Sequence, residues 1–371
     1  MKALIALNSF KGTASSRDAG EAVARGIRSA DPSAEVRVVA IADGGDGTVE
    51  AFHLGLGGKM RHFTVHGPLY EHRRAAILFL EHGIAVAEMA SAAGLVFVPP
   101  PLRNPQNTTT LGVGELIRAA ISGGARKIYM GLGGSATVDG GIGAAAALGV
   151  HFLDAQGHPV SLSGKGLSRI ATIELDALDP RVREVEIVAL TDVDSPLLGP
   201  AGAPRMFGPQ KGADPLTVEL LETGMANLAN VVAEALGKDL RNVAGAGSAG
   251  GLGFGLAAFL GATIEQGAPA ILHAIHFNDA LGWADVVITG EGRLDVQSRR
   301  GKAPEEVRRR ARSAGKPVFA LAGSVDSSAG SDYDGAFSLV EIVGEKDAFH
   351  KTMESIEKAA STIWPQISRK K

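Results

Sequence analysis

Apolar and polar positions near the start of the chain alternate in the manner of a strand, a helix and a second strand. Residues 3–7 form a short apolar run, and residues 15–29 carry apolar side chains at the three- or four-residue spacing of an amphipathic helix. A second apolar run occupies residues 36–41. This order predicts a βαβ unit whose polar, glycine-bearing turns lie at the carboxyl ends of two parallel strands.

The end of the chain returns to the same pattern. We predict strands over residues 285–289, 318–322 and 336–343, and helices over residues 304–313 and 348–363. Spacing of this kind is again typical of βαβ units, so both ends of the chain are expected to build one Rossmann-like domain.

The middle of the chain follows a different pattern. Short alternating runs over residues 61–65, 75–80 and 84–87 are joined by Gly-Pro and His-Gly turns, which predict an antiparallel meander. A buried strand over 186–190 and a long amphipathic helix over 216–236 follow. These elements indicate a second domain.

The predicted fold is therefore a two-domain α/β fold. Residues 1–60 and 284–371 would form a Rossmann-like domain with a parallel sheet. Residues 61–283 would form an inserted α/β domain with a mixed sheet, and this domain would carry the glycine-rich loops.

Composition narrows the classes of partner. The formal net charge of −3 offers no sustained basic face, and aromatic residues make up only 5% of the chain, so nucleic acid is not an expected partner. The chain has no cysteine, which excludes disulfides, thiolate zinc sites and a cysteine nucleophile. No apolar run is long enough for a bilayer span or a signal peptide, so we expect a cytoplasmic protein without membrane contact.

Residues 127–142 give the clearest indication of a ligand-binding site, because a short apolar run is followed by a cluster of glycines and then by an Ala-rich segment. The pattern predicts strand, turn and helix. Glycines leave room for backbone N–H groups to approach a ligand, and the amino end of a following helix favours an anion. We expect Gly133, Gly134 and Ser135 to bind phosphate.

The same stretch has a rival interpretation. Gly131-x-Gly133-x-x-Ala136 fits the dinucleotide-binding fingerprint, and Asp154 follows at about the distance expected for the acid that binds the ribose. An NAD-dependent dehydrogenase therefore remains an alternative. Asp139 argues against it, because a carboxylate in the first helical turn would repel a pyrophosphate unless Mg²⁺ lay between them. Metal-bound nucleotide is favoured, with Asp139 as a candidate metal ligand.

Residues 245–253 repeat the composition of the first loop and again run into an apolar helix. Gly247, Ser248, Gly250 and Gly251 are therefore candidate nucleotide-binding residues. Two loops suited to binding phosphate suggest a polyphosphate ligand. The alternative explanation is that these glycines allow helices to pack closely.

Acids and cations follow several predicted strands. Asp192 and Asp194 come directly after the strand over 186–190, and no Lys or Arg nearby in the sequence would neutralise them, so Asp192 is a candidate general base or metal ligand. Arg293 and Asp295 belong to a dense polar segment after another strand; Asp295 could take either of these roles. Lys11 follows the first strand and, like Arg293, could hold an anionic substrate group.

Two large classes of phosphate-binding protein are excluded because their motifs are missing. The chain is not a P-loop NTPase, since no Gly-Lys pair is followed by Ser or Thr. It is not a protein kinase, since neither His-Arg-Asp nor Asp-Phe-Gly occurs.

The chain nevertheless resembles the bacterial type-1 glycerate kinases over essentially its full length. The family's Asp-Ser-Phe-Lys-Gly appears with Asn8 in first place, its Ala-Asp-Gly-Gly-Glu-Gly-Thr appears at 42–48 with Asp46 for Glu, and Val138 stands where Asn is expected. The remaining matching blocks are residues 131–137, 139–141, 191–193, 207–213, 250–253, 288–295 and 301–302.

This resemblance implies ATP-dependent phosphorylation of D-glycerate, usually at the 2-hydroxyl, in a cleft between two α/β domains. ATP and Mg²⁺ would be the cofactors, and Asp192, Lys11, Arg293 and Asp295 the catalytic residues, with Asp192, Asp295 and Asp139 as metal candidates. A monomer or homodimer is expected. Phosphorylation at the 3-hydroxyl, a dehydrogenase and a catalytically silent nucleotide-binding module remain the alternatives.

Overall fold

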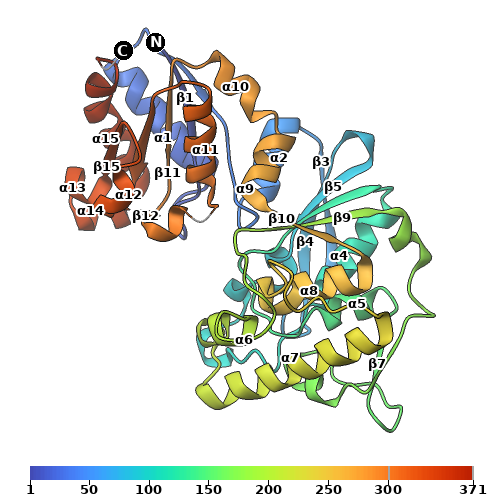
Figure 1. Cartoon of the computed structure of the whole chain (residues 1–371). Coiled ribbons are helices and arrows are strands. Elements are labelled where there is room, and N and C mark those ends of the chain that lie inside the picture. The colour runs from blue at the N-terminus through green and yellow to red at the C-terminus, as the bar shows by residue number, and fades with distance from the viewer. Residues whose placement is uncertain (300, 370–371) are drawn as a thin grey trace. The chain divides into compact units, whose positions relative to one another are not determined.

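The chain divides into two compact units, each described here by itself. The computed structural model describes residues 1–299 and 301–369. Unit 1 comprises Met1–Asp43, Glu50–Gly57 and Gln266–Lys371, and unit 2 comprises Gly44–Val49 and Gly58–Glu265 (Figure 1).

The assignment of domains stays a prediction, and these compact units differ from its bounds. Residues 266–283 lie in unit 1, because helices α9 (Gly267–Ala274) and α10 (Phe277–Trp283) pack with α11 and β1. Residues 44–49 and 58–60 lie in unit 2.

Unit 1 is built on a five-stranded parallel sheet of order β15-β13-β11-β1-β2. Its strands are β1 (Lys2–Leu7), β2 (Glu35–Val38), β11 (Val286–Gly290), β13 (Val318–Ala322) and β15 (Gly335–Ser338). The chain leaves β1 towards β2 on one side, whereas β11, β13 and β15 extend the sheet on the other. The topological switch point therefore lies between β1 and β11, where open α/β sheets usually bind ligands.

Helices cover this sheet as the apolar spacing predicts. Helix α1 (Ser16–Ala30) is capped by Ser15, whose hydroxyl oxygen accepts a hydrogen bond from the Asp18 amide, and it packs beside α15 (Thr352–Ile367). Helix α11 (Ala303–Ser313) contacts β1, β11 and β13 (Figure 1). The remaining elements of unit 1 are α2 (Thr48–Leu56), whose first two residues belong to unit 2, β12 (Arg293–Leu294), β14 (Ser324–Val325), α12 (Ser327–Gly330), α13 (Leu339–Val343) and α14 (Glu345–His350).

Two predicted strands end earlier than expected. The strand predicted over 336–343 stops at Ser338, because the Ser338 hydroxyl oxygen accepts a hydrogen bond from the Glu341 amide and starts helix α13. The strand predicted over 36–41 ends at Val38 and is half exposed rather than buried, as an edge strand can be.

Unit 2 is built on a six-stranded mixed sheet of order β10-β9-β6-β5-β4-β3. The predicted meander is confirmed, since β3 (Lys59–His66), β4 (His72–Phe79) and β5 (Ile84–Glu88) pair antiparallel. Strands β5, β6 (Lys127–Gly131) and β9 (Glu186–Thr191) are parallel, so their carboxyl ends share one edge. The other strands are β10 (Thr263–Gln266) and the separate pair β7 (His151–Leu153) and β8 (Thr172–Glu174).

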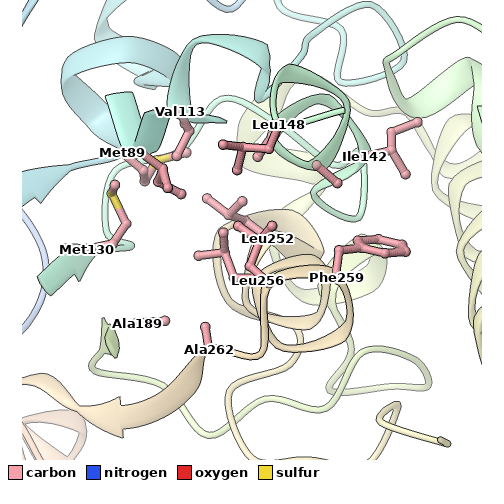
Figure 2. Close-up of a cluster of buried hydrophobic side chains, with 14 of the residues drawn as sticks. Met89, Val113, Met130, Ile142, Leu148, Ala189, Leu252, Leu256, Phe259 and Ala262 are labelled. Atoms are coloured by element: carbon pink, nitrogen blue, oxygen red, sulfur yellow. The ribbon is translucent and has the colours of Figure 1, made fainter. Parts of the chain in front are cut away.

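The core of unit 2 lies between this sheet and helices α4, α5 and α8. Figure 2 shows Met130 of β6 and Ala189 of β9 on the sheet side, with Leu252 and Leu256 of α8 facing them. The helices of this unit are α3 (Ala90–Ala93), α4 (Leu111–Ser122), α5 (Ile142–Ala147), α6 (Ala203–Phe207), α7 (Pro215–Leu236) and α8 (Ser248–Leu260). Short 3-10 turns occupy Glu81–Gly83, Leu95–Phe97, Pro100–Leu102, Gly164–Arg169, Pro180–Glu184, Pro209–Lys211 and, in unit 1, Val296–Arg299.

A parallel sheet and a mixed sheet confirm the predicted α/β fold class. In the described part of the chain, no helix combines the length and the apolar character that crossing a membrane requires.

Candidate active site

The first glycine-rich loop follows β6 at the carboxyl edge of the unit 2 sheet. The Leu132 amide donates to the Leu190 carbonyl of β9, and the Gly133 amide donates to the Gly44 carbonyl at 3.0 Å. A Cβ on Gly133 would collide with the Gly45 backbone, so glycine is required here for close approach of two chain segments. Gly134 is exposed at the tip of the loop with φ +76°, and Ser135 is buried.

A helix does not follow this loop directly, which corrects the sequence-based expectation. Helix α5 begins at Ile142 and has only six residues, and Asp139 lies before it rather than in its first turn. Alanine-rich composition favours helix, but Gly140 and Gly141 both adopt positive φ and delay its start. The helix dipole therefore gives no support to anion binding at Gly133 and Gly134.

The second loop supports the first instead of presenting glycines to a ligand. Gly247, Ser248, Gly250 and Gly251 are all buried. The Gly140 amide donates to the Gly250 carbonyl, and a Cβ on Gly250 would collide with the Thr137 carbonyl oxygen. Positive φ at Ala249, Gly250 and Gly251 interrupts the start of α8. Tight packing, the alternative weighed for this loop, explains these glycines best.

Replacing Gly250 by alanine is expected to lower the free energy of unfolding by about 2–6 kcal/mol, because it combines a positive-φ backbone with a collision against Thr137. The midpoint of thermal unfolding measures this loss. Gly282→Ala is the control: Gly282 is exposed in α10 with open space around it, so alanine should change stability by no more than about 1 kcal/mol. Equal stability of both variants would contradict the packing role.

Lys211 is a site residue that sequence analysis did not single out. It lies in the turn Pro209–Lys211, is 2% exposed, and its Nζ donates to Ser135 Oγ and to the Thr137 carbonyl oxygen, both at 2.7 Å. Burial lowers the pKa of Lys211 to about 7, although the charge of Asp139 opposes the shift. The buried Lys211 amino group thus ties the turn Pro209–Lys211 to the first glycine-rich loop.

Asp139 is occupied by the protein itself, which argues against its predicted role as a metal ligand. The side chain is fully buried, one oxygen accepts from the Thr110 amide and hydroxyl, each at 2.8 Å, and the other accepts from the Gly141 amide at 3.1 Å. Burial raises the pKa of Asp139 while these hydrogen bonds oppose the rise. Asp139 holds the loop and the start of α4 together.

Asp154 is likewise committed to its own turn, which weakens the dehydrogenase alternative. It accepts hydrogen bonds from the Gln156 and His158 amides and forms an ion pair with Arg169 at 2.7 Å. The His158 amide is the chief cause that lowers the pKa of this carboxyl. Strand β7, which Asp154 follows, pairs antiparallel with β8 rather than parallel with β6, so the βαβ unit that a dinucleotide fingerprint requires is missing here.

Asp192 follows β9 at the same edge of the unit 2 sheet as the first loop. Its side chain is partly buried, whereas Asp194 in the same turn is exposed. Gly44 approaches the backbone of Leu190 and Thr191 so closely that a Cβ would lie 2.7 Å from the Leu190 carbonyl. The segment 44–49, the first glycine-rich loop and the Asp192 turn are therefore neighbours.

The other predicted site residues lie at the carboxyl edge of the unit 1 sheet. Arg293 is 66% exposed and forms ion pairs with Asp295 at 3.3 Å and Asp326 at 3.7 Å, so its positive charge is shared by two carboxylates. Lys11 is exposed in the loop after β1. Its backbone lies near Gly292, in the loop after β11.

A dedicated metal site is not found among the residues that the structure describes: they contain no group of three or more His, Asp or Glu side chains able to hold an ion. Mg²⁺ in nucleotide-dependent enzymes usually keeps several waters and binds one or two carboxylates plus the phosphates. Asp192, with a partly buried carboxylate at the strand edge, fits this limited role.

Glycine-rich and acidic loops lie at the carboxyl edges of parallel strands, which is where open α/β folds place their ligand-binding sites. Comparison with known proteins gives the family. The glycerate kinase family model matches residues 3–369. Glycerate kinase of Bacillus subtilis (strain 168) is 42% identical, covering 99% of this chain and 98% of its own length.

Two further relatives cover nearly the whole chain or all of it. Glycerate 2-kinase of Escherichia coli (strain K12) is 40% identical over 98% of this chain and 97% of its own length. The crystal structure of putative glycerate kinase 2 from Salmonella typhimurium LT2 matches with a TM-score of 0.86 at 39% identity, covering 100% of this chain and 98% of that one. The chain belongs to the glycerate kinase family, and it is a kinase; the resemblance noted in the sequence is confirmed.

Proposed function

We propose that this protein transfers the γ-phosphoryl group of ATP to the 2-hydroxyl of D-glycerate, giving 2-phosphoglycerate and ADP. The observation that carries the proposal is the full-length relationship to glycerate kinases, one of which is named a glycerate 2-kinase. The loop geometry of unit 2 supports it, because backbone and acidic groups gather at one sheet edge.

The proposed roles follow the geometry of each unit. In unit 2, Gly133, Gly134 and Ser135 line the phosphate loop, while Gly247, Ser248, Gly250 and Gly251 support it from behind. Asp192 would accept the hydroxyl proton as the alcohol oxygen bonds to phosphorus and the bond to the ADP oxygen breaks. Mg²⁺, when bound with ATP, would neutralise phosphate charge. In unit 1, Arg293 or Lys11 would hold the carboxylate of glycerate, with Asp295 as the reserve acid.

Identification of the product by ³¹P and ¹³C NMR tests the proposal. Incubation with ATP, Mg²⁺ and ¹³C-labelled D-glycerate should give 2-phosphoglycerate. Formation of 3-phosphoglycerate would establish the alternative regiochemistry, and failure to consume glycerate would contradict the proposal. Binding of NAD without Mg²⁺ would favour the dehydrogenase instead.

Replacing Arg293 by alanine should raise the KM for glycerate by about 10–100-fold and change the KM for ATP much less, because a charge-assisted hydrogen bond to a carboxylate contributes about 1.5–3 kcal/mol. Steady-state kinetics with each substrate varied in turn measure the two constants. Arg312→Ala is the control, since Arg312 in the last turn of α11 pairs with Asp334, which directly precedes β15 and therefore lies at the amino ends of the strands. An equal rise in the KM for glycerate and the KM for ATP would show that Arg293 does not hold the glycerate carboxylate. Lys11 would then be the remaining candidate.

A further inference from the structure

Glu291 stands out among the acids of unit 1 because it is buried with one oxygen unused. It follows β11 directly, is 6% exposed, and among the described residues its Oε1 has no hydrogen-bond partner. An unsatisfied buried acceptor destabilises the folded protein, so its presence calls for an explanation. Glu50 and Glu222 also carry such an oxygen, but they lie on helices and are less buried.

The surroundings of Glu291 form the switch point of the parallel sheet. Residues after β1 and β11 meet here, since the Asn8 amide donates to the Gly290 carbonyl at 2.8 Å. The Asn8 side chain is itself occupied: its Nδ2 donates to Asp43 and its Oδ1 accepts from the Ser9 amide. Asn8 therefore holds Asp43 in place, whereas Glu291 is a buried residue at this edge whose Oε1 has no hydrogen-bond partner among the described residues.

The charges around Glu291 determine what kind of ligand group can bind to its Oε1. Lys302 Nζ lies 3.5 Å from Oε2. Burial raises the pKa of Glu291, Asp43 adds to the rise, and Ser298 and Lys302 oppose it. An anion is disfavoured beside two carboxylates, and a metal ion lacks further acidic ligands among the described residues and would face Lys302. A neutral hydrogen-bond donor fits this environment.

We propose that Glu291 binds a hydroxyl group of a ligand through Oε1, forming a hydroxyl-recognition subsite between the ends of β1 and β11. This inference rests on the proposed function, which supplies two hydroxyl-bearing ligands: the hydroxyl of glycerate that does not react, and the ribose of ATP. Both offer the same chemistry. The hydroxyl donates to Oε1 and removes the cost of the unused acceptor.

The test compares Glu291→Gln with the parent protein by isothermal titration calorimetry, using each ligand and its deoxy analogue. The analogues are D-lactate, which lacks the 3-hydroxyl of glycerate, and 2′-deoxy-ATP and 3′-deoxy-ATP. The parent protein should bind one analogue about 10-fold or more weakly than the full ligand, because the buried carboxylate is left unpaired. In Glu291→Gln this discrimination should fall to a few-fold, which a purely structural role would not produce.

Glu306→Gln is the matched control. Glu306 is also a buried glutamate of unit 1, but Arg309 and Arg310 satisfy it, so its replacement should leave ligand discrimination unchanged. Because Gln has the shape of Glu, Glu291→Gln should fold, and an unchanged circular dichroism spectrum verifies this.

The outcomes separate the two proposals. Loss of discrimination with D-lactate assigns the subsite to glycerate, and loss with a deoxy-ATP assigns it to ribose. Full retention of discrimination in folded Glu291→Gln, against all three analogues, overturns the inference while the proposed function stands. A parent protein that binds neither glycerate nor ATP overturns both.

Discussion

Asp192→Asn is expected to lower turnover by about 10²–10⁴-fold, the usual loss when a general base is removed. Asparagine keeps the shape of the side chain and removes its charge, so the fold should persist. In phosphoryl transfer the hydroxyl proton is accepted late, and a carboxylate at the strand edge suits this task. Turnover is to be measured at saturating glycerate, ATP and Mg²⁺, with the Mg²⁺ requirement determined separately.

Asp194→Asn provides the control for this prediction, because Asp194 belongs to the same turn but is exposed. It should retain turnover within a few-fold. An increased Mg²⁺ requirement in Asp192→Asn would assign the carboxylate to metal binding, whereas an unchanged requirement would assign it to the base. Turnover of Asp192→Asn close to that of the parent would move both roles to Asp295.

The free energy of unfolding should rise with pH between about 7 and 10, by roughly 1 kcal/mol for each pH unit, through Lys211 alone. In this range an unfolded chain keeps the lysine protonated, because its ordinary pKa is 10.5, whereas the folded protein with a pKa of about 7 has released the proton. The unfolded state binds more protons, so raising the pH favours the folded state. Below pH 7 both states are protonated and the dependence on this group ends.

Urea unfolding of the parent and of Lys211→Met across this range measures the effect, because the difference between their slopes isolates Lys211 from all other groups. Methionine should flatten the slope, and it also leaves Ser135 and the Thr137 carbonyl without their donor. Lys165→Met, at an exposed lysine of the same unit, should keep the parent slope. Parallel slopes for the parent and Lys211→Met would refute the lowered pKa of Lys211 in the folded protein.

Helices and strands were predicted well where the spacing of apolar residues within a short segment determines the type of element. The βαβ unit at the start of the chain, the antiparallel meander and the helix α7 follow the expected periods. Errors arose where a single polar contact changes the path of the chain. The Ser338 cap converts the second half of a predicted strand into helix α13, and nothing in the apolar pattern marks that change.

The site was predicted less completely than the fold, because burial of charged residues is set by contacts between distant segments. Asp139 and Asp154 were chosen as ligand-binding acids from their position in the sequence, yet the protein itself supplies their hydrogen bonds. In the sequence Lys211 appeared only within the matching block 207–213 and was given no role of its own. Its burial depends on Ser135 and Thr137, which no local pattern connects to it.

The parallel pairing of β1 with β11 has a consequence for the folding of this protein during its synthesis on the ribosome. Lys2 and Asp285, joined by a hydrogen bond at the start of the two strands, are 283 positions apart in the chain. At about 5–20 residues per second, a ribosome needs about 15–60 s to travel that distance. During this time β1 has been synthesised but has no β11 to pair with, while the residues 58–265 of unit 2 are completed. A nascent chain that stalls before Val286 would therefore expose the unpaired backbone edge of β1 and its apolar side chains to chaperones and proteases, even with the whole of unit 2 already translated.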